Sequence, residues 1–338
     1  MTQYEAEVKL CPACGQKNTG EFPETVTNPT QYGPNLTAFI AYLHQYQMVP
    51  FQRMAEFVSD LFSQNISEGT LVNRVKRVSE KLKGTETLIK ERLLESPVLH
   101  FDETGAYVKD ERQWLHSTSS DSYTHFFIHP KRGEKAMIAN GVLPEYDGIA
   151  MHDCWASYFK FENCGHSICG VHLLRDLKSV GELNKQEWVK PMTKILLEAK
   201  LFSEDNAYPL PADKIFGFEK EFDQILAQGH AANPVRLKPD GKKEKNTESQ
   251  RLLNRLEKRK EEIFQFLYTE EAPFDNNQAE RDIRMTKVKQ KVSGTFRTEQ
   301  GAEDFARIRS VISTMRKQGT RILKGLNSLI SGGPSPTA

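Results

Sequence analysis

The sequence has no long apolar segment and almost no net charge. No apolar run in its 338 residues approaches the roughly 18 to 20 residues that a membrane-spanning helix needs. Its first ten residues, MTQYEAEVKL, also lack the basic-then-apolar order of a secretion signal. We therefore expect a cytoplasmic protein with no membrane partner. The formal net charge of +1 does not by itself indicate a polyanionic partner.

Cysteine is scarce as well. The chain has five cysteines, an odd number spread over a sizeable sequence. This argues against a disulfide framework and favours reduced thiols or metal ligands. With 38% hydrophobic and 27% charged residues, the composition is that of an ordinary globular protein, and the length allows two or three packed units.

Positive charge is concentrated near the C-terminus. Between residues 281 and 324 the sequence has twelve basic residues and only four acidic ones. A local surplus of this size is typical of a surface that binds nucleic acid.

The first third of the chain divides into a connector and a helical region. Residues 1–35 are expected to form a Cys-x-x-Cys knuckle at Cys11 and Cys14 and an irregular connector, because residues 11–35 are rich in Pro, Gly, Asn and Thr. Residues 36–96 contain helical periodicity, with Ser67 as the expected N-cap of the last and longest run. The second run, residues 51–62, places four apolar residues on one face: Met54, Phe57, Val58 and Leu61.

Two functions are compatible with this helical region. Its last helix is basic and follows a short polar turn, as in a helix-turn-helix that binds DNA. A helical bundle with a solvated basic face fits the same pattern equally well.

Residues 97–182 change to a strand-like pattern. Three short segments rich in β-branched and aromatic residues come first, followed by a helix, a strand, a second helix, a strand and a third helix. This is the chain order of the ribonuclease H fold, an α/β fold with a mixed sheet, in which the first and fourth strands are neighbours. We therefore expect Asp102 and Asp153, on those two strands, to meet in space.

The remaining sequence is expected to be mostly helical. Residues 183–270 form a charged helical insertion, which is either a solvated helical pair or a direct DNA contact. Residues 271–330 return to the core with basic helices, and residues 331–338 form a disordered tail.

Three acidic motifs carry the chemistry: Asp102 in HFDETG, Asp153 in GIAMHD and Glu280 in NNQAERDIR. Carboxylates about 4 Å apart repel one another by about 4 kcal/mol per pair at an effective dielectric constant near 20, so a cation is needed among them. Oxygen ligands favour Mg²⁺ or Mn²⁺. Two such ions can promote attack on a phosphodiester and stabilise its leaving oxygen.

The third motif has its own supporting residues. Asp275 or Asn276 is placed to cap the helix that contains Glu280, and Asn277, Arg281 and Arg284 lie within one turn of Glu280. The residues expected to contact DNA are Asn277, Arg281, Arg284, Lys287, Lys289, Lys291 and Arg297.

From about Cys11 to Leu326 the sequence resembles a transposase of the insertion sequence 66 family. The similarity rests on HFDETGAYV, GIAMHDCWASYFKF, CGVHLLRDL and the long stretch APFDNNQAERDIRMTKVKQKVSGTFRTEQGAEDFARIRSVISTMRKQG. It implies a bacterial, nucleoid-associated enzyme of the DDE type that cuts and joins transposon ends and acts as an oligomer. It also implies a catalytic, metal-binding triad of Asp102, Asp153 and Glu280.

The resemblance extends to two further cysteine motifs. Cys169 and His172 match a Cys-x-x-His pair of related transposases, and we expect them to pack or hydrogen-bond around the site. The family's zinc module has two Cys-x-x-Cys knuckles, whereas this sequence has only Cys11 and Cys14. A structural zinc ion needs four ligands, so we expect no bound zinc unless another segment or chain contributes, and weaker recognition of transposon ends.

Two alternative functions remain open from the sequence. One is a transposase-derived DNA-binding protein that is no longer catalytic. The other is a nuclease of the same fold that cleaves DNA without joining strands. The terminal repeats, target-site preference, oligomeric state and helper proteins cannot be read from one chain.

Overall fold

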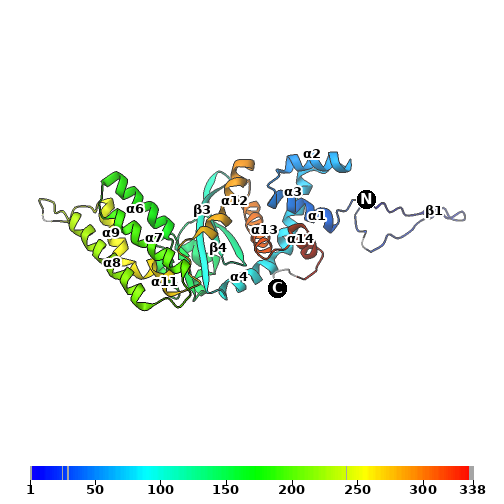
Figure 1. Cartoon of the computed structure of the whole chain (residues 1–338). Helices are drawn as coiled ribbons and strands as arrows, with labels where there is room; N and C mark the ends of the chain where they lie inside the picture. Colours follow the sequence, from blue (N-terminus) through cyan, green and yellow to red (C-terminus); the bar gives the residue numbers. More distant parts are fainter. Residues whose placement is uncertain (1, 25, 29, 241, 335–338) are drawn as a thin grey trace.

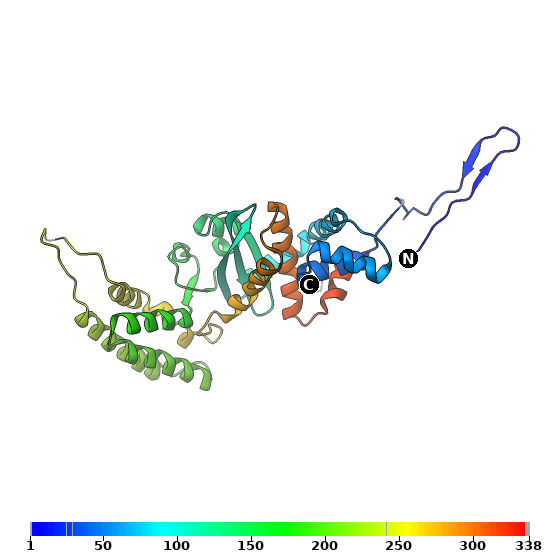
Figure 2. The same ribbon diagram turned by 90° about the horizontal axis from the view of Figure 1, so that it is seen from above.

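A computed structural model describes residues 2–24, 26–28, 30–240 and 242–334. Seen in two perpendicular views, the chain is elongated, with a helical insertion at one end, a sheet in the middle and the N-terminal helices beyond it (Figures 1 and 2). The last four residues of the expected disordered tail, 335–338, lie outside the described residues.

The central sheet has five strands. They are β3 (Val98–Val108), β4 (Glu111–Ser119), β5 (Thr124–His129), β6 (Ile149–His152) and β7 (Gly165–Ile168). Their order across the sheet is β5-β4-β3-β6-β7; β3, β4 and β5 are antiparallel neighbours, whereas β6 pairs in parallel with both β3 and β7. The first and fourth strands of the sheet are therefore adjacent, which confirms the predicted ribonuclease-H-like α/β fold.

Short helices connect the strands on the β6 side of the sheet. Helix α5 (Glu134–Asn140) and the 3₁₀ turn η2 (Leu143–Glu145) lead from β5 to β6, and η3 (Tyr158–Lys160) leads from β6 to β7. Each connection returns the chain to the end of the sheet at which the previous strand began, so that the next strand can run parallel to it.

The N-terminal helical region contains more breaks than the sequence suggests. Helix α1 (Pro34–Ala41) continues into the π-helical turn η1 (Tyr42–Tyr46), and α2 (Phe51–Phe62) follows. The expected long third helix is two helices, α3 (Glu68–Lys81) and α4 (Lys83–Leu94).

The start and the break of the third helix have local causes. Ser67 caps α3 as predicted, because its hydroxyl accepts a hydrogen bond from the Thr70 amide at 3.2 Å. Leu82, at φ −89° and ψ 0°, leaves helical geometry between α3 and α4. Its side chain is fully buried, together with Val78 before the break and Ile89 after it. The change of direction thus lets both helices bury their apolar faces in one core.

The predicted apolar face of α2 is only half buried. Met54 and Val58 lie in the core, but Phe57 is 43% and Leu61 is 56% exposed. The neighbours of α2 are η1 and α3, which cover only the Met54 side of the helix. Whether α2 and α3 form a DNA-binding helix-turn-helix remains a prediction.

The insertion has its own hydrophobic core. Its helices are α6 (Gly170–Asn184), α7 (Val189–Asp205), α8 (Ala212–Ala232), α9 (Glu248–Lys258), α10 (Lys260–Ile263) and α11 (Gln265–Tyr268). Helix α6 begins in the sheet region and ends in the insertion, so the predicted boundary after residue 182 falls inside its last turn. Residues 233–240 and 242–247 are not helical, and a capping box of Thr247 and Gln250 begins the next helix, α9.

The C-terminal helices join the other parts of the molecule. They are α12 (Asn277–Ser293), α13 (Glu299–Lys317) and α14 (Ile322–Ile330). Helix α12 lies on β3 and β4, α13 contacts β5, α3 and α4, and α14 packs against α1. One continuous core therefore contains side chains from the N-terminal helices, the sheet and α13, such as Ile89, Leu99 and Val311.

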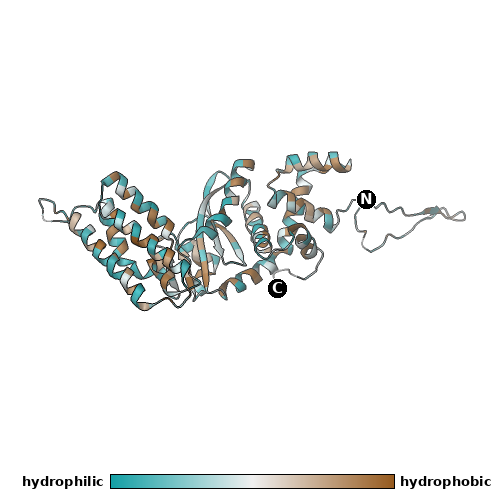
Figure 3. Cartoon of the chain, in the orientation of Figure 1, coloured by the Kyte–Doolittle hydropathy of each residue, from teal (hydrophilic) through white to brown (hydrophobic). Residues whose placement is uncertain are grey.

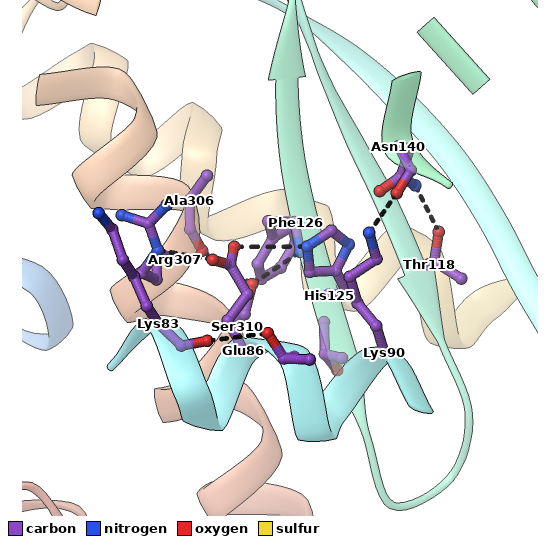
Figure 4. A network of polar contacts seen from close by, with 12 residues as sticks. Lys83, Glu86, Lys90, Thr118, His125, Phe126, Asn140, Ala306, Arg307 and Ser310 are labelled. Carbon is purple, nitrogen blue, oxygen red and sulfur yellow. Dashed lines mark hydrogen bonds and ion pairs between the residues drawn. The ribbon is translucent and has the colours of Figure 1, made fainter. Parts of the chain in front are cut away.

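A polar network also links the N-terminal helices to the sheet (Figure 4). Glu86 of α4 accepts a hydrogen bond from Arg307 of α13 at 2.5 Å and lies 3.4 Å from His125 of β5. Burial opposes the ionisation of Glu86, but His125 and Arg307 outweigh it and lower the Glu86 pKa. Burial also lowers the pKa of His125, so the neutral ring donates a hydrogen bond to Glu86 rather than forming an ion pair. Arg307 additionally bonds Ser79 of α3 at 2.7 Å.

The N-terminal segment projects from the body as a hairpin. Strands β1 (Val8–Leu10) and β2 (Lys17–Thr19) are exposed along their whole length, and Cys11 and Cys14 are unpaired thiols in the turn. Amides of Cys14 and Ala13 lower the pKa of the Cys11 thiol. No third His, Cys, Asp or Glu ligand accompanies this pair within the part of the chain that the structure describes.

Apolar and polar residues are interspersed along the helices (Figure 3). Among the described residues, none of the helices is long and apolar enough to cross a membrane. The apolar stripes instead match the faces that are buried in the cores described above.

Candidate active site

The pairing of β3 with β6 brings two of the acidic motifs together. Val98 pairs with Ile149 and His100 with Met151, an offset of 51 residues in each pair. The same offset separates Asp102 from Asp153, so continuing the ladder by two residues places them opposite each other. Asp102 is within β3, and Asp153 follows β6 directly.

The turn after β6 fixes the Asp153 side chain. Its Oδ1 accepts a hydrogen bond from the Trp155 amide at 3.0 Å, and Cys154 between them has a left-handed φ of 71°. The second carboxylate oxygen, Oδ2, lies 3.6 Å from the Arg132 guanidinium. The turn thereby holds the carboxylate at the strand end.

Glu280 lies in the first turn of α12, which packs on β3. Asp275 caps this helix as one of the two predicted candidates, since its Oδ1 accepts the Asn277 amide at 3.0 Å. Asn276 occupies the N-cap position, but its side chain makes no capping bond. Asp275 therefore stabilises the start of the helix, and the Asn276 side chain is available for other hydrogen bonds.

Asn276 anchors the start of α12 to the sheet. Its amide nitrogen Nδ2 donates to the Phe101 carbonyl at 2.8 Å, and its Oδ1 pairs with His100 Nδ1 at 2.8 Å. Its backbone amide donates to Cys169 Sγ at 3.2 Å. Asn276 is 1% exposed. Through these bonds it fixes the segment before Glu280 against the residues just before Asp102.

The sequence pointed to Asn276 only as a helix cap and did not indicate His100, so the bond between them was not predicted. Both are polar residues with buried side chains, and their partners are about 175 positions away in the chain. The doubled asparagine before the basic helix was a usable signal, because a buried Asn must satisfy both its donors and its acceptor.

Acidic neighbours surround Asp102. Burial is the largest cause that raises its pKa from 3.8 to about 7, and the charges of Glu103, Asp153 and Glu280 raise it further. A hydrogen bond at 2.8 Å from the Glu103 amide opposes the shift only in part. The influence of Asp153 and Glu280 on this pKa indicates that the three predicted carboxylates share one electrostatic neighbourhood.

Glu103 is a fourth carboxylate at this site, and the sequence analysis did not assign it a role. Its buried side chain accepts hydrogen bonds from Tyr158 at 2.6 Å and from Arg132 Nε at 2.7 Å. Arg132 lies over the rings of Trp155, at 4.2 Å, and Trp114, at 5.1 Å. This guanidinium contacts both Glu103 and Asp153, so it couples the two strands at the site.

Glu280 has basic partners on α6. Its Oε1 lies 3.7 Å from Arg175 and 3.8 Å from His172. Cys169 is buried and accepts a hydrogen bond from the Asn276 amide, and the His172 ring lies beside Glu280, so both residues lie around the site. Arg175 was not identified from the sequence.

The donors at the site suit a hard divalent ion. The carboxylates are oxygen ligands and outnumber the nearby cations. Burial, and after it the neighbouring carboxylates, raise the pKa of Asp102, a shift that a bound cation would oppose. Within the described ranges, however, no three His, Cys, Asp or Glu side chains are close enough to share one ion. Asp102 and Asp153, at adjacent strand positions, are the residues that would hold a metal, whereas Glu280 contacts Arg175 at 3.7 Å.

A basic stripe extends from Glu280 along α12. Asn277, Arg281, Arg284 and Lys291 are exposed and share one face of the helix, at successive spacings of four, three and seven positions. Lys287 is exposed at the edge of this stripe. Lys287 Nζ also bonds the Gly105 carbonyl of β3 at 3.0 Å. Arg297 is exposed beyond the end of the helix.

Lys289 does not belong to this surface, contrary to the sequence prediction. It is 7% exposed, and its ammonium lies 5.1 Å from the centre of the Phe296 ring. Burial lowers its pKa. The spacing of Lys289 puts it on the opposite side of α12 from Arg284, where the helix packs on the sheet.

We expect Asp102→Asn to stabilise the metal-free protein above pH 7. The pKa of Asp102 lies near 3.8 unfolded and near 7 folded, so only the folded state binds this proton between those values and stability falls as pH rises. Removing the charge should recover on the order of 4 kcal/mol at pH 8, and progressively less toward pH 4. Urea unfolding at pH 8 and pH 5 measures the difference.

The exposed substitution Asp60→Asn serves as control and should change stability at neither pH. Equal stability of Asp102→Asn and the unmodified protein at pH 8 would contradict the electrostatic description of the site.

Comparison with known proteins supplies the family. A search of curated proteins found no match. The model of the Transposase IS66 family matches residues 29–304, which include the whole sheet, the insertion and all three acidic motifs. Since the match spans most of the sequence, this chain belongs to the IS66 family of transposases.

Proposed function

We propose that the protein cuts DNA at transposon ends and joins the freed ends to target DNA in a metal-dependent reaction. Asp102, Asp153 and Glu280 are the proposed catalytic residues. The observation that supports this most directly is the 51-residue offset of the β3–β6 pairing, which equals the separation of Asp102 and Asp153, together with the packing of the Glu280 helix on β3. Membership of a transposase family supports the reaction class.

Bound Mg²⁺ or Mn²⁺ ions would supply Lewis-acid activation of the attacking oxygen and stabilisation of the leaving oxygen. Residues of the chain hold the proposed catalytic carboxylates in position. Arg132 and the Trp155 amide hold the Asp153 carboxylate, and Asn276 fixes the start of α12 against β3. Arg175, 3.7 Å from the Glu280 carboxylate, offsets part of its negative charge.

The exposed part of α12 is the proposed DNA surface. Arg281, Arg284 and Lys291 can hold phosphates along a strand whose scissile bond lies at Glu280. Such contacts release counterions, so affinity should fall by about 0.9 log units per contact for each log unit of salt. The protein would act at the bacterial nucleoid as a homo-oligomer that pairs two DNA ends.

The experiment uses purified protein and linear DNA that contains the sequences flanking the gene. With Mg²⁺ or Mn²⁺ present, we expect nicks with free 3′-hydroxyl ends and, with a target plasmid added, covalent joints between donor and target. Cleavage without joints would identify a nuclease instead. Binding without either product would identify a DNA-binding protein that is not catalytic.

A further inference from the structure

A cleft of about 460 Å³ lies beside the N-terminal end of α12. The start of β3, the turn between β4 and β5 and the segment before α12 form its walls. Residues that characterise it are Val98, His100, Asp121, Tyr123, Asp275 and Arg281. None of the three proposed catalytic carboxylates lines this cleft, but Asn277 and Arg281 of the basic stripe do.

His100 presents a free hydrogen-bond acceptor to the cleft. Asn276 Nδ2 donates to the Phe101 carbonyl, so Asn276 Oδ1 is the atom that faces His100 Nδ1. His100 Nδ1 must therefore carry the hydrogen, which leaves Nε2 as an acceptor in the neutral ring. The side chain is 6% exposed, and in the described part of the chain Nε2 has no hydrogen-bond partner.

The other charged groups of the cleft are three carboxylates and one guanidinium. Asp121, Glu271 and Asp275 add carboxylate acceptors to that of His100, while Arg281 supplies a positive charge on the side of the basic stripe. Tyr123 adds an aromatic ring. A ligand that fits offers hydrogen-bond donors to these acceptors and an anionic group to Arg281.

We propose that this cleft binds one unpaired nucleotide of the DNA strand, next to the scissile bond, and prefers a base with an exocyclic amino group. This inference rests on the proposed function. Arg281 contacts the nucleotide's phosphate, Tyr123 stacks on the base, and the acceptors receive the amino hydrogens, as carboxylates do from cytosine N4. A lysine-rich peptide would also satisfy the acceptors, but it offers no phosphate to Arg281, which belongs to the basic stripe.

Cytosine and uracil provide a matched pair of probes, because the amino group of one is replaced by a carbonyl in the other. We expect fluorescein-labelled oligo(dC) to bind at pH 8 about fivefold more tightly than oligo(dU). This ratio corresponds to the net contribution of about one hydrogen bond to the binding affinity. Fluorescence anisotropy measures both affinities. Ser122→Trp, which fills the exposed rim of the cleft, should abolish the difference.

Ser331→Trp, at an exposed position after α14, is the matched control and should leave the preference intact. His100→Phe should remove the preference as well, with thermal unfolding to check that the protein is folded. Equal binding of the two oligonucleotides by the unmodified protein overturns the inference, as does a preference that survives Ser122→Trp. If oligolysine binds and Ser122→Trp abolishes this binding whereas Ser331→Trp does not, the inference is overturned and the cleft binds a cationic peptide.

The failure of the inference can be separated from failure of the proposed function. If both oligonucleotides bind equally and Arg284→Gln weakens both, the cleft proposal is wrong and the DNA surface stands. If neither oligonucleotide nor duplex DNA binds at low salt, the proposed function itself is wrong.

Discussion

Asp153→Asn is expected to lose DNA cleavage while the protein keeps its fold. Asparagine retains the Oδ1 acceptor for the Trp155 amide, so the turn after β6 is preserved. It loses the charge that would hold a divalent ion between β3 and β6. Losing several kcal/mol of transition-state stabilisation corresponds to a rate at least about a thousandfold lower. Single-turnover cleavage at pH 8 in saturating Mg²⁺ gives the rate.

The matched control is Asp147→Asn, an exposed aspartate just before the same strand, which should cleave at the unmodified rate. DNA affinity should be similar in all three proteins, because the basic stripe on α12 is unchanged. Full Mg²⁺-dependent cleavage by Asp153→Asn would remove Asp153 from the proposed triad. Loss of cleavage by Asp147→Asn would show that the assay reports folding.

Arg307→Met is expected to destabilise the protein by about 3 kcal/mol at pH 7, because it leaves the Glu86 carboxylate without its cationic partner. The two side chains are only 16% and 20% exposed, so solvent screens the pair weakly. Its loss also removes the hydrogen bond to Ser79, which weakens the junction of α3, α4 and α13. Urea unfolding followed by circular dichroism measures the free energy of unfolding.

The pH dependence tests the cause of this loss. In the unmodified protein the Glu86 pKa is lowered, so its stabilising effect is present above its ordinary pKa of 4.5 and is lost as pH falls below that value. The cost of Arg307→Met should therefore shrink as the pH falls below 4.5 and Glu86 becomes protonated. Lys83→Met breaks the exposed pair with Glu80 and should have no measurable effect. An equal loss of stability at pH 4 and pH 7 would point to lost packing instead.

Local sequence patterns predicted much of the fold. The strand-like segments between residues 97 and 182 predicted the sheet because period-two patterns and turn residues are local properties. Ser67 predicted the start of α3 for the same reason: a cap acts on the next three residues. Asp102 and Asp153 were identified because each stands out as a charge within or directly after an apolar strand.

Long-range packing decided what could not be read locally. The pattern could not show that α2 would bury Met54 but expose Phe57, because that depends on which helices cover it. It could not separate Lys289 from its basic neighbours on α12 either, since the sheet surface selects the buried side of the helix. Glu103 and Arg132 similarly acquired their roles only when β3 and the segment after β5 came together.

The sequence by itself thus determined the order of strands and helices, the three acidic motifs and the basic helix, all of which depend on residues close together in the chain. The tertiary structure alone decided that Asn276 joins the start of α12 to β3, and that Arg132 and Arg175 flank the carboxylates. Only folding sets the geometry of contacts between residues dozens to more than a hundred positions apart. Hydrogen bonds and charge interactions act over a few ångströms, so the chemistry of the site depends on that geometry.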